Sequence, residues 1–424
     1  MSESDRQING ERVTRREFAK RAAFGVGGSL AFDFERAPHE APGQQGVAHF
    51  NSAGASLMPG PVLNAVQKHL QLEAEIGGYE AAEAQAGAVE QTYQALARLL
   101  GCSTDEVALV ENATRGWDMA FYGMSFQPGQ RILTSAHEYG SNYIAYLHVA
   151  RRTGAVVQVL PSDEHGQVSI DDLRKALERG RVALVGLTHI PATGGLVNPV
   201  EEVGQLTRAA GVPFLLDACQ SVGQWPVDVD TIGCDMLCGT GRKWLRGPRG
   251  TGFLYVRRSM IGRLEPPLLD LKAARLVDRT RYEIEPTARR FETWESNVAG
   301  MIGLGVAVDY ALTQGVEAIR ARIVPLAERV RQQLASIPGV TVQEVGLKRS
   351  GIVTFTIRAQ DAVTVRSKLR ALRVNVSSIG RRSTPLEFEQ RGLDIVVRAA
   401  VHYFNTEEEV QQLVGGVRQI ARAR

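Results

Sequence analysis

The segment CDMLCGTGRKWLRGPRGTGFLY, residues 234–255, contains a single lysine, Lys243, which lies between Arg242 and Trp244. Five glycines surround it, and Thr240 precedes it by three positions. The pattern predicts a strand that ends in a glycine-containing bend and is followed by a second strand-like run. Threonine, arginine and lysine at the end of a strand suit a phosphate group and a carbonyl that a lysine amine captures as a Schiff base. The alternative is a solvated surface lysine, because most lysines are exposed.

Strand-like runs alternate with helix-like segments from Val107 onward. The segments Ser169–Gly180 and Asn198–Gly211 have polar starts, apolar residues three and four apart, and glycine stops, as crossover helices do. This alternation predicts an α/β large domain with a mainly parallel sheet flanked by helices and with ligands at the carboxyl ends of the strands. The strand-like runs are VALVE, RILTS, VVQVLP, VALVGLTHI, VPFLLDACQ and GTGFLYV.

The pattern changes in the last quarter of the chain. A long helix-like stretch, VEAIRARIVPLAERVRQQLASI, precedes the strand-like runs VTVQEV, GIVTFTI and DIVVRAAVHYF. Thr406 and Glu409 have the spacing of a capping box at the start of a last helix. We therefore expect a leader at 1–45, a large domain at 46–305 whose N-terminal part can pack on the small domain, and a smaller α+β domain at 306–424.

The leader contains TRREFAK, residues 14–20, followed by the mildly apolar stretch AAFGVGGSLAF. Paired arginines before such a stretch resemble a twin-arginine signal, which exports folded proteins to the bacterial periplasm. However, the apolar stretch is short, and no clean small-x-small cleavage site follows it. The alternative is a basic leader without structure on a cytoplasmic protein, so both compartments stay open.

The composition indicates an ordinary globular protein. Hydrophobic residues make up 44% of the 424 residues, and 49 Lys+Arg against 46 Asp+Glu leave a net charge of +3. This near balance gives no sign of a nucleic-acid partner. No apolar run reaches about eighteen residues, so no membrane span is expected. The four cysteines are too few for a disulfide framework and lack zinc-site spacing, so no metal is expected; they are Cys102, Cys219, Cys234 and Cys238.

Two further segments place polar side chains where they could meet the lysine. Asp217 follows the apolar run VPFLL, and a carboxylate at the end of a buried strand needs a strong hydrogen bond or a cation. It either caps the next helix or keeps a pyridine nitrogen protonated. Thr114 begins a helical pattern, where it is a plain N-cap or part of a phosphate seat. With Lys243, these segments favour a cofactor that has a phosphate, a carbonyl and a pyridine ring.

The same segments carry a resemblance to a known family. NAT, HEYGSN, DACQ, GTGRKW and GPRGTGFLY, followed by RFETWESN and VVRAAVHYFNTEEEV, resemble the class V aminotransferase group of pyridoxal-phosphate enzymes of fold type I, which includes the cysteine desulfurases. The match runs from His49 to the C-terminus. The stretch EIGGYEAAEAQAG, residues 75–87, resembles the subgroup of ergothioneine-pathway C–S lyases and isopenicillin N epimerase-like proteins, although a helix with a glycine break is the alternative.

The resemblance implies a role for each of nine residues. Lys243 would form the internal aldimine with pyridoxal 5'-phosphate, Asp217 would pair with its pyridine nitrogen, and Gln220 would bond its phenolic oxygen. Tyr139 lies where many relatives stack a histidine on the ring, and an aromatic face can serve the same purpose. Arg398 would grip the substrate α-carboxylate, with a surface arginine as the alternative. The phosphate would be held by Ala113, Thr114, Thr240 and Arg242.

The reaction depends on the residues near the substrate. Cysteine desulfurases of this family carry a nucleophilic cysteine on a loop shortly before the carboxylate arginine, but the corresponding stretch here, NVSSIGRRSTPLEFEQRG, has none. Cys219 beside Asp217 is interpreted as packing. We therefore expect β-elimination of a sulfur group from a cysteine-derived amino acid, with Lys243 as the base that removes the Cα proton. Aminotransfer and epimerisation use the same first steps and stay open as alternatives.

A homodimer is also implied by the resemblance, since active sites of this fold type usually form between two subunits. In RFETWESN this chain has Glu295 where relatives often place a threonine that reaches the partner's phosphate. An acid there would repel the phosphate. Ser296 or a backbone group would then replace the contact, or the contact is missing.

Three other classes fit less well. GTGRKW has Trp244 at the third glycine of a dinucleotide-binding motif, and Arg257 and Arg258 where the ribose-binding acid belongs. A phosphate-binding P-loop fails because no serine or threonine follows Lys243. A relative that uses the fold only for binding or regulation is harder to exclude than these two, but it would not need to keep Lys243 together with Asp217 and Arg398.

Overall fold

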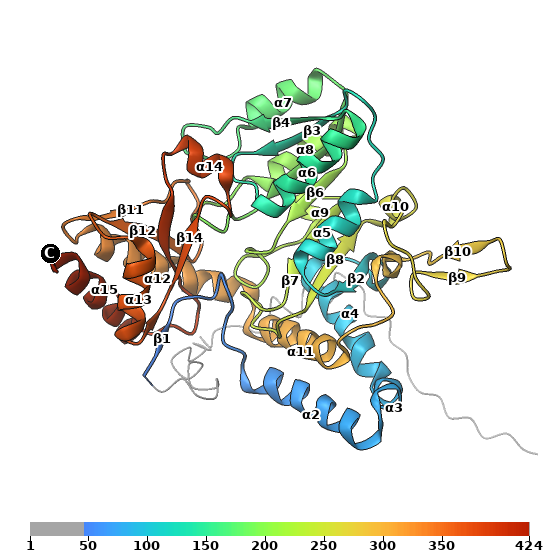
Figure 1. Ribbon diagram of the computed structural model, residues 1–424, viewed down its shortest axis with the longest axis horizontal. Helices are drawn as coiled ribbons and strands as arrows, with labels where there is room; N and C mark the ends of the chain where they lie inside the picture. The colour runs from blue at the N-terminus through green and yellow to red at the C-terminus, as the bar shows by residue number, and fades with distance from the viewer. Residues whose placement is uncertain (1–45, 424) are drawn as a thin grey trace, which may run out of the picture.

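The computed structural model describes residues 46–423, and a seven-stranded sheet forms its centre (Figure 1). The strand order is β2-β8-β7-β6-β5-β3-β4; β8 is antiparallel to both neighbours, and the other pairs are parallel. The predicted α/β class with a mainly parallel sheet is confirmed, and the predicted leader lies outside the described residues. The strands are β2 (Val107–Val110), β3 (Arg131–Ser135), β4 (Val156–Leu160), β5 (Val182–Thr188), β6 (Phe214–Asp217), β7 (Met236–Thr240) and β8 (Gly252–Val256).

Helices cover both faces of this sheet because successive strand residues point to opposite faces. On β6, Phe214 and Leu216 pack into one core with residues of α7 and α8, whereas Leu215 packs into a second core with residues of α5 and α6. The predicted polar start at Ser169 is an N-cap whose side chain accepts from Asp172 N–H. The helices are α5 (Ala113–Tyr122), α6 (Gly140–Thr153), α7 (Ile170–Glu178), α8 (Val200–Ala210), α9 (Val229–Ile232) and α10 (Arg258–Ile261).

The N-terminal helices pack together beside the sheet. Helix α2 (Gly60–Ile76) ends at Gly77, whose φ of 99° suits glycine, and α3 (Gly78–Ala84) begins directly after it. The stretch GGYEAAE is therefore a helix interrupted at glycine. Helix α3 leads into α4 (Ala86–Leu100), and both α2 and α4 contact α11 (Val298–Gln314).

The C-terminal part forms a four-stranded antiparallel sheet in the order β11-β12-β15-β14. Residues of α12, α13 and α15 share a buried core with Phe355 and Val397 of this sheet. The capping box predicted at Thr406 and Glu409 is confirmed. The boundary expected at residue 305 falls inside α11, and the division of the chain there stays a prediction. The elements are α12 (Val316–Ala335), β11 (Val340–Val342), β12 (Ile352–Ile357), α13 (Ala362–Ala371), β14 (Ser377–Gly380), α14 (Pro385–Gln390), β15 (Ile395–Ala400) and α15 (Glu407–Arg422).

The first described strand lies beside this C-terminal sheet. Strand β1 (Ala48–His49) pairs in parallel with β13 (Val374–Asn375). The amide of Ala400 in β15 donates to the carbonyl of Phe50, which continues the contact. Chain segments separated by more than three hundred residues are therefore joined by backbone hydrogen bonds, and β1 lies beside the C-terminal elements in Figure 1.

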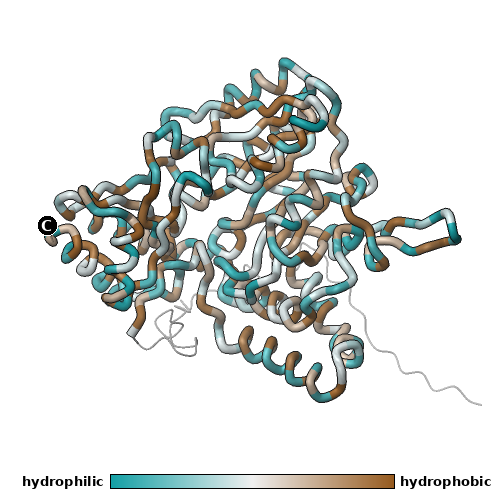
Figure 2. Tube along the Cα trace, in the orientation of Figure 1, coloured by the Kyte–Doolittle hydropathy of each residue, from teal (hydrophilic) through white to brown (hydrophobic). Residues whose placement is uncertain are grey.

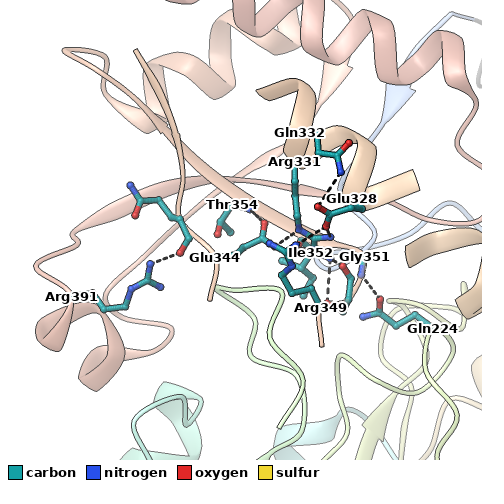
Figure 3. Close-up of polar contacts among 12 residues, drawn as sticks. Gln224, Glu328, Arg331, Gln332, Glu344, Arg349, Gly351, Ile352, Thr354 and Arg391 are labelled. Atoms are coloured by element: carbon teal, nitrogen blue, oxygen red, sulfur yellow. Dashed lines mark hydrogen bonds and ion pairs between the residues drawn. The ribbon is translucent and has the colours of Figure 1, made fainter. Parts of the chain in front are cut away.

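A buried ion pair fixes the loop between β11 and β12 (Figure 3). Arg331 Nε of α12 lies 2.5 Å from Glu344 Oε2, and both side chains are at most 3% exposed. Glu344 also accepts from Thr354 N–H. The end of the loop reaches the segment that follows β6 of the large sheet, because Gly351 N–H donates to Gln224 Oε1 at 3.0 Å. The ion pair thus holds a segment that connects the two sheets.

A hairpin projects from the rest of the molecule (Figure 2) and carries exposed apolar residues. The hairpin consists of β9 (Ala274–Leu276) and β10 (Tyr282–Ile284). Leu276 is 73% exposed and Tyr282 is 53% exposed. No helix within residues 46–423 has the length and apolar character needed to span a membrane.

Candidate active site

A cavity of ≈ 260 Å³ lies at the carboxyl ends of β5 and β6, beside the N-termini of α5 and α6. This edge is where sheets of mainly parallel strands bind ligands. Thr240 and Arg398 are not part of its lining, but the other seven predicted residues are. These seven are Ala113, Thr114, Tyr139, Asp217, Gln220, Arg242 and Lys243.

Lys243 enters the cavity from the bend after β7. Backbone bonds from Arg246 N–H to Lys243 O and from Gly247 N–H to Gly241 O close this bend. Nζ of Lys243 lies 3.1 Å from Sγ of Cys219, and no carboxylate of residues 46–423 forms an ion pair with it. Lys243 is half-buried against a thiol and is not a solvated surface lysine.

Asp217 ends β6 and faces the cavity as a buried carboxyl, 5% exposed. Its Oδ1 accepts from Cys219 N–H at 2.9 Å, and its Oδ2 accepts from Asn142 Nδ2 at 3.0 Å. Burial raises the pKa of Asp217, while Cys219 N–H, Lys243 and Asn142 lower it. The alternative that Asp217 caps the next helix is wrong, because α9 begins at Val229 and has Asp228 as its N-cap. Asp217 instead orders the turn after β6 and presents a carboxyl to the cavity.

The N-terminus of α5 opens toward the same cavity. Asn112 is the N-cap, and its side chain accepts from Arg115 N–H. The expectation that Thr114 is a plain N-cap is wrong, because Asn112 occupies that place and Thr114 follows Ala113 inside the first turn. First-turn N–H groups have no partner within a helix, so those of Ala113 and Thr114 suit an anion.

Arg242 lines the cavity near this helix end, whereas Thr240 lies behind it. The Thr240 hydroxyl donates to Thr251 O at 3.0 Å and accepts from Arg242 Nη1 at 3.3 Å. Arg242 therefore lies at the predicted phosphate site. Thr240 lies behind Arg242 and accepts a hydrogen bond from it.

Arg398 of β15 is buried, 5% exposed, so the alternative of a surface arginine is wrong. Its Nε donates to Ser377 Oγ at 3.1 Å, and its Nη1 donates to Ala192 O at 2.8 Å. Ala192 lines the cavity. Burial lowers the pKa of Arg398 to about 10. No acidic side chain of residues 46–423 pairs with this guanidinium, which leaves it available for a carboxylate that enters from outside.

Gln220 and Tyr139 complete the predicted lining. The Gln220 amide donates to Ala53 O at 3.1 Å and accepts from Trp244 Nε1 at 2.8 Å, so one N–H stays available for a ligand. Tyr139 precedes α6 and is 36% exposed. A Cβ on the next residue, Gly140, would lie 2.2 Å from Arg382 O, so glycine permits the segment before α14 to approach Tyr139.

Four residues that sequence reasoning left without a role also surround the site. Asn142 bonds Asp217, Thr188 lines the cavity, and Cys219 contacts Lys243. Glu138 accepts hydrogen bonds from both Asn142 and Thr188. The only signal in the sequence was the run of polar residues HEYGSN at the start of a helix, where Asn142 lies one turn after Glu138.

The residues present fit pyridoxal 5'-phosphate. A buried carboxyl, Asp217, suits the pyridine nitrogen, and Lys243, which forms no ion pair within residues 46–423, suits the aldehyde. The N-terminus of α5 with Arg242 suits the phosphate. The fold and this cavity define a pyridoxal-phosphate enzyme of fold type I.

Comparison with known proteins agrees with this class. Residues 48–413 match the family model described as aminotransferase class-V, so the chain belongs to the class V aminotransferase family. It is 30% identical to a probable cysteine desulfurase of Xylella fastidiosa, over 81% of this chain and 82% of that protein. It is 26% identical to a probable cysteine desulfurase of Pyrococcus abyssi, over 90% of this chain and 96% of that protein.

A solved structure shows the same arrangement. The apo cysteine desulfurase of Thermococcus onnurineus has a TM-score of 0.84 and is 25% identical, covering 89% of this chain and 95% of that chain. Family membership makes this protein a pyridoxal-phosphate-dependent enzyme of the lyase or transferase type.

Proposed function

We propose that this protein is a C–S lyase that performs β-elimination on a cysteine-derived amino acid. The reaction converts R–S–CH2–CH(NH3+)–COO− and water into R–SH, pyruvate and ammonium. The observation that carries the proposal is the lack of a thiol before Arg398. Residues 377–397 contain no cysteine, and Cys219 is the only described cysteine that lines the cavity.

Each proposed role follows from the position of a side chain. Pyridoxal phosphate, when bound, supplies a ring that stabilises negative charge at Cα. Lys243 would hold the aldehyde carbon of the cofactor and, once displaced by the substrate amine, take the proton from Cα. Asp217 would keep the pyridine nitrogen protonated, and Arg398 would bind the α-carboxylate and so orient the substrate. The C–S bond would then break with its electrons on sulfur, and the thiolate would take up a proton and leave as a thiol.

The segment before β15 supports elimination over transfer of sulfur to the protein. The relatives are named cysteine desulfurases, and a persulfide on the protein requires a cysteine beside the substrate sulfur. Here α14 occupies that segment and is held on the large sheet. Its Glu387 accepts from Thr193 Oγ1 at 2.9 Å and lies 3.4 Å from His137 Nδ1. Sulfur would therefore leave the cavity as a small thiol.

Product analysis with the holoenzyme tests this proposal. Cysteine, cystine, S-alkyl cysteines and cysteine sulfoxides are supplied in turn, and pyruvate, ammonia, alanine and protein-bound sulfur are measured. We expect pyruvate and ammonia in equal amounts, with unchanged products in a Cys219→Ser variant. Alanine with protein-bound sulfur would overturn the proposal. A keto acid formed only with an amino acceptor would indicate an aminotransferase, and solvent hydrogen at Cα without cleavage would indicate an epimerase.

We also propose that the protein acts as a homodimer on a small amino-acid substrate. Support comes from the exposed apolar hairpin and from the end of the cavity formed by Arg249 and Gly250, which lies at the molecular surface. Glu295 and Ser296 lie next to this end, together with Gly250, around a small separate cavity. A partner subunit could approach the phosphate there.

A further inference from the structure

Glu138 is a buried carboxyl group behind the wall of the candidate active site. It follows β3, is 1% exposed and does not itself line the cavity. Its two oxygens accept different donors. Oε1 accepts from Tyr139 N (2.9 Å), Asn142 Nδ2 (2.9 Å) and Thr188 Oγ1 (2.7 Å), whereas Oε2 accepts from Thr134 Oγ1 (2.9 Å) and Tyr146 OH (3.2 Å).

All three donors to Oε1 belong to residues that line the cavity. Asn142 makes a second contact, because the same Nδ2 donates to Asp217 Oδ2 at 3.0 Å. An amide nitrogen carries two N–H bonds, so bridging two carboxyl groups uses both of them. Glu138 and Asp217 together therefore decide which way the Asn142 amide faces.

No cation of residues 46–423 pairs with Glu138. Glu344, by contrast, is equally buried but lies against Arg331 (Figure 3). Burial raises the pKa of Glu138 to about 7, although the bonds from Thr188 and Asn142 lower it. Only neutral donors therefore stabilise the ionised form of Glu138. A cationic ring bonded to Asp217 would be the nearest positive charge, and it would favour that ionised form.

We propose that Glu138 is a positioning residue for the cofactor: through Asn142 it orients Asp217, and it places a second negative charge behind that carboxyl group. The inference rests on the proposed pairing of Asp217 with the pyridine nitrogen. A second negative charge strengthens the attraction for a protonated ring nitrogen, which is the form that withdraws electrons. The bonds to Tyr139 N–H and Thr188 fix two further parts of the cavity wall.

Glu138→Gln removes the negative charge of the side chain but keeps its size and shape. A glutamine oxygen can accept from the three donors at the cavity side, and its NH2 group can donate to the hydroxyl oxygens of Thr134 and Tyr146, which rotate to suit. Glu292→Gln is the matched control. Glu292 is also buried, 3% exposed, and accepts from a tyrosine hydroxyl and a backbone N–H. It does not line the cavity, and it differs from Glu138 in lying 3.7 Å from Lys272 Nζ.

The direct readout is the ¹⁵N chemical shift of the ring nitrogen in enzyme loaded with ¹⁵N-labelled pyridoxal phosphate. Asp217→Asn supplies the reference for a nitrogen without its proton. We expect the shift in Glu138→Gln to move from the wild-type value toward that reference, and Glu292→Gln to keep the wild-type value. Supporting residues behind a ligand are typically worth about 10- to 100-fold, so kcat should fall by about that factor, with KM changed less than about threefold.

A wild-type shift and kcat in Glu138→Gln would overturn the inference. A second result would also overturn it: Glu138→Gln loses as much thermal stability as Glu292→Gln, and the ¹⁵N shift does not move. Glu138 would then have only a structural role. If Glu138→Gln does not fold, Asn142→Leu breaks the same bridge and must move the shift. The shift needs no substrate, so it decides this inference even if no substrate yields pyruvate. A wild-type shift in Asp217→Asn would instead remove the role on which both proposals depend.

Discussion

Cys219 is the thiol beside Lys243 in the cavity, and its pKa bears on whether it can accept sulfur from a substrate. Burial raises the pKa of Cys219, although Lys243 at 3.1 Å lowers it. The thiolate is the nucleophilic form, so a thiol with a raised pKa is a poor acceptor of sulfur at neutral pH. The raised pKa therefore disfavours Cys219 as a sulfur acceptor, in agreement with the proposed elimination.

Replacement of Lys243 tests the lysine directly. Lys243→Ala should lower kcat by at least about a thousandfold, because the base at Cα and the covalent hold on the cofactor are both lost. The wild-type protein should be yellow, lose the colour with borohydride and then carry the mass of the reduced cofactor on the Lys243 peptide. Arg246→Lys alters the same bend without touching the cavity and should keep that labelling. Full activity in Lys243→Ala would refute the assignment.

Arg398 offers a second prediction at this scale. Arg398→Lys keeps a positive charge but loses the planar fork that binds a carboxylate through two bonds. We expect kcat/KM for a cysteine conjugate to fall about 10- to 100-fold, with the absorption of the bound cofactor unchanged. The control is the amide of the same conjugate, which lacks the α-carboxylate and should react equally slowly with both proteins. Equal losses for both substrates would contradict carboxylate binding.

At the scale of elements, α14 joins the C-terminal part to the large sheet through Glu387. Besides Thr193 and His137, Glu387 bonds Arg391 at 2.8 Å. Burial opposes ionisation of Glu387, but His137, Arg391 and Thr193 outweigh it and lower its pKa to about 2. This carboxylate therefore helps to fix α14 against the segments that follow β3 and β5.

This carboxylate predicts a loss of stability in acid. The pKa of Glu387 is lower in the folded chain than its ordinary 4.5, so its contribution is complete above about pH 4.5 and is lost as the pH falls toward about 2. Urea unfolding followed by circular dichroism should show Glu387→Gln a few kcal/mol less stable than wild type at pH 7, with a much smaller difference at pH 3. The exposed Glu389 of the same helix is the control, and Glu389→Gln should match wild type at both values. A difference that does not depend on pH would contradict the argument.

The elements also show why some side chains were placed correctly from sequence and others were not. Asp217 and Lys243 follow apolar runs that form neighbouring strands, so chain order alone brings them to one edge of the sheet. Thr240 is a strand residue whose hydroxyl bonds Thr251 of the next segment, a contact that its own neighbours in sequence do not reveal. Asn112 takes the cap of α5 because its backbone is extended, with φ of −171°, which the motif NAT does not specify.

For the whole molecule, the projecting hairpin predicts a dimer. Leu276 of the hairpin and Leu271, which shortly precedes the hairpin, are 73% and 71% exposed, and such apolar surface is usually covered. Analytical ultracentrifugation should give twice the mass of one chain, and Leu271→Asp with Leu276→Asp should give a monomer with reduced activity. Leu347→Asp changes a residue that is 68% exposed on a different part of the chain and should leave the dimer intact. A fully active monomer would contradict the prediction.

Sequence reasoning recovered the α/β class, the family and seven of the residues that line the cavity, because each depends on local patterns and on their order. It did not recover the bridge from Glu138 through Asn142 to Asp217. Asn142 and Asp217 are 75 residues apart in the chain, and only the parallel pairing of β5 with its neighbours brings them together. Polar groups that are buried against one another leave no periodicity in the sequence.

The parallel pair of β1 and β13 has a consequence for synthesis on the ribosome. The partner of Ala48 is Val374, and Ala400 N–H donates to the carbonyl of Phe50. The first described residues therefore pair with residues that are synthesised near the end of translation. The seven-stranded sheet can assemble while translation continues, since all its strands precede residue 257. Residues 48–50, by contrast, can take their final place only when elongation is nearly complete, and a nascent chain stalled before β13 would leave them without backbone partners.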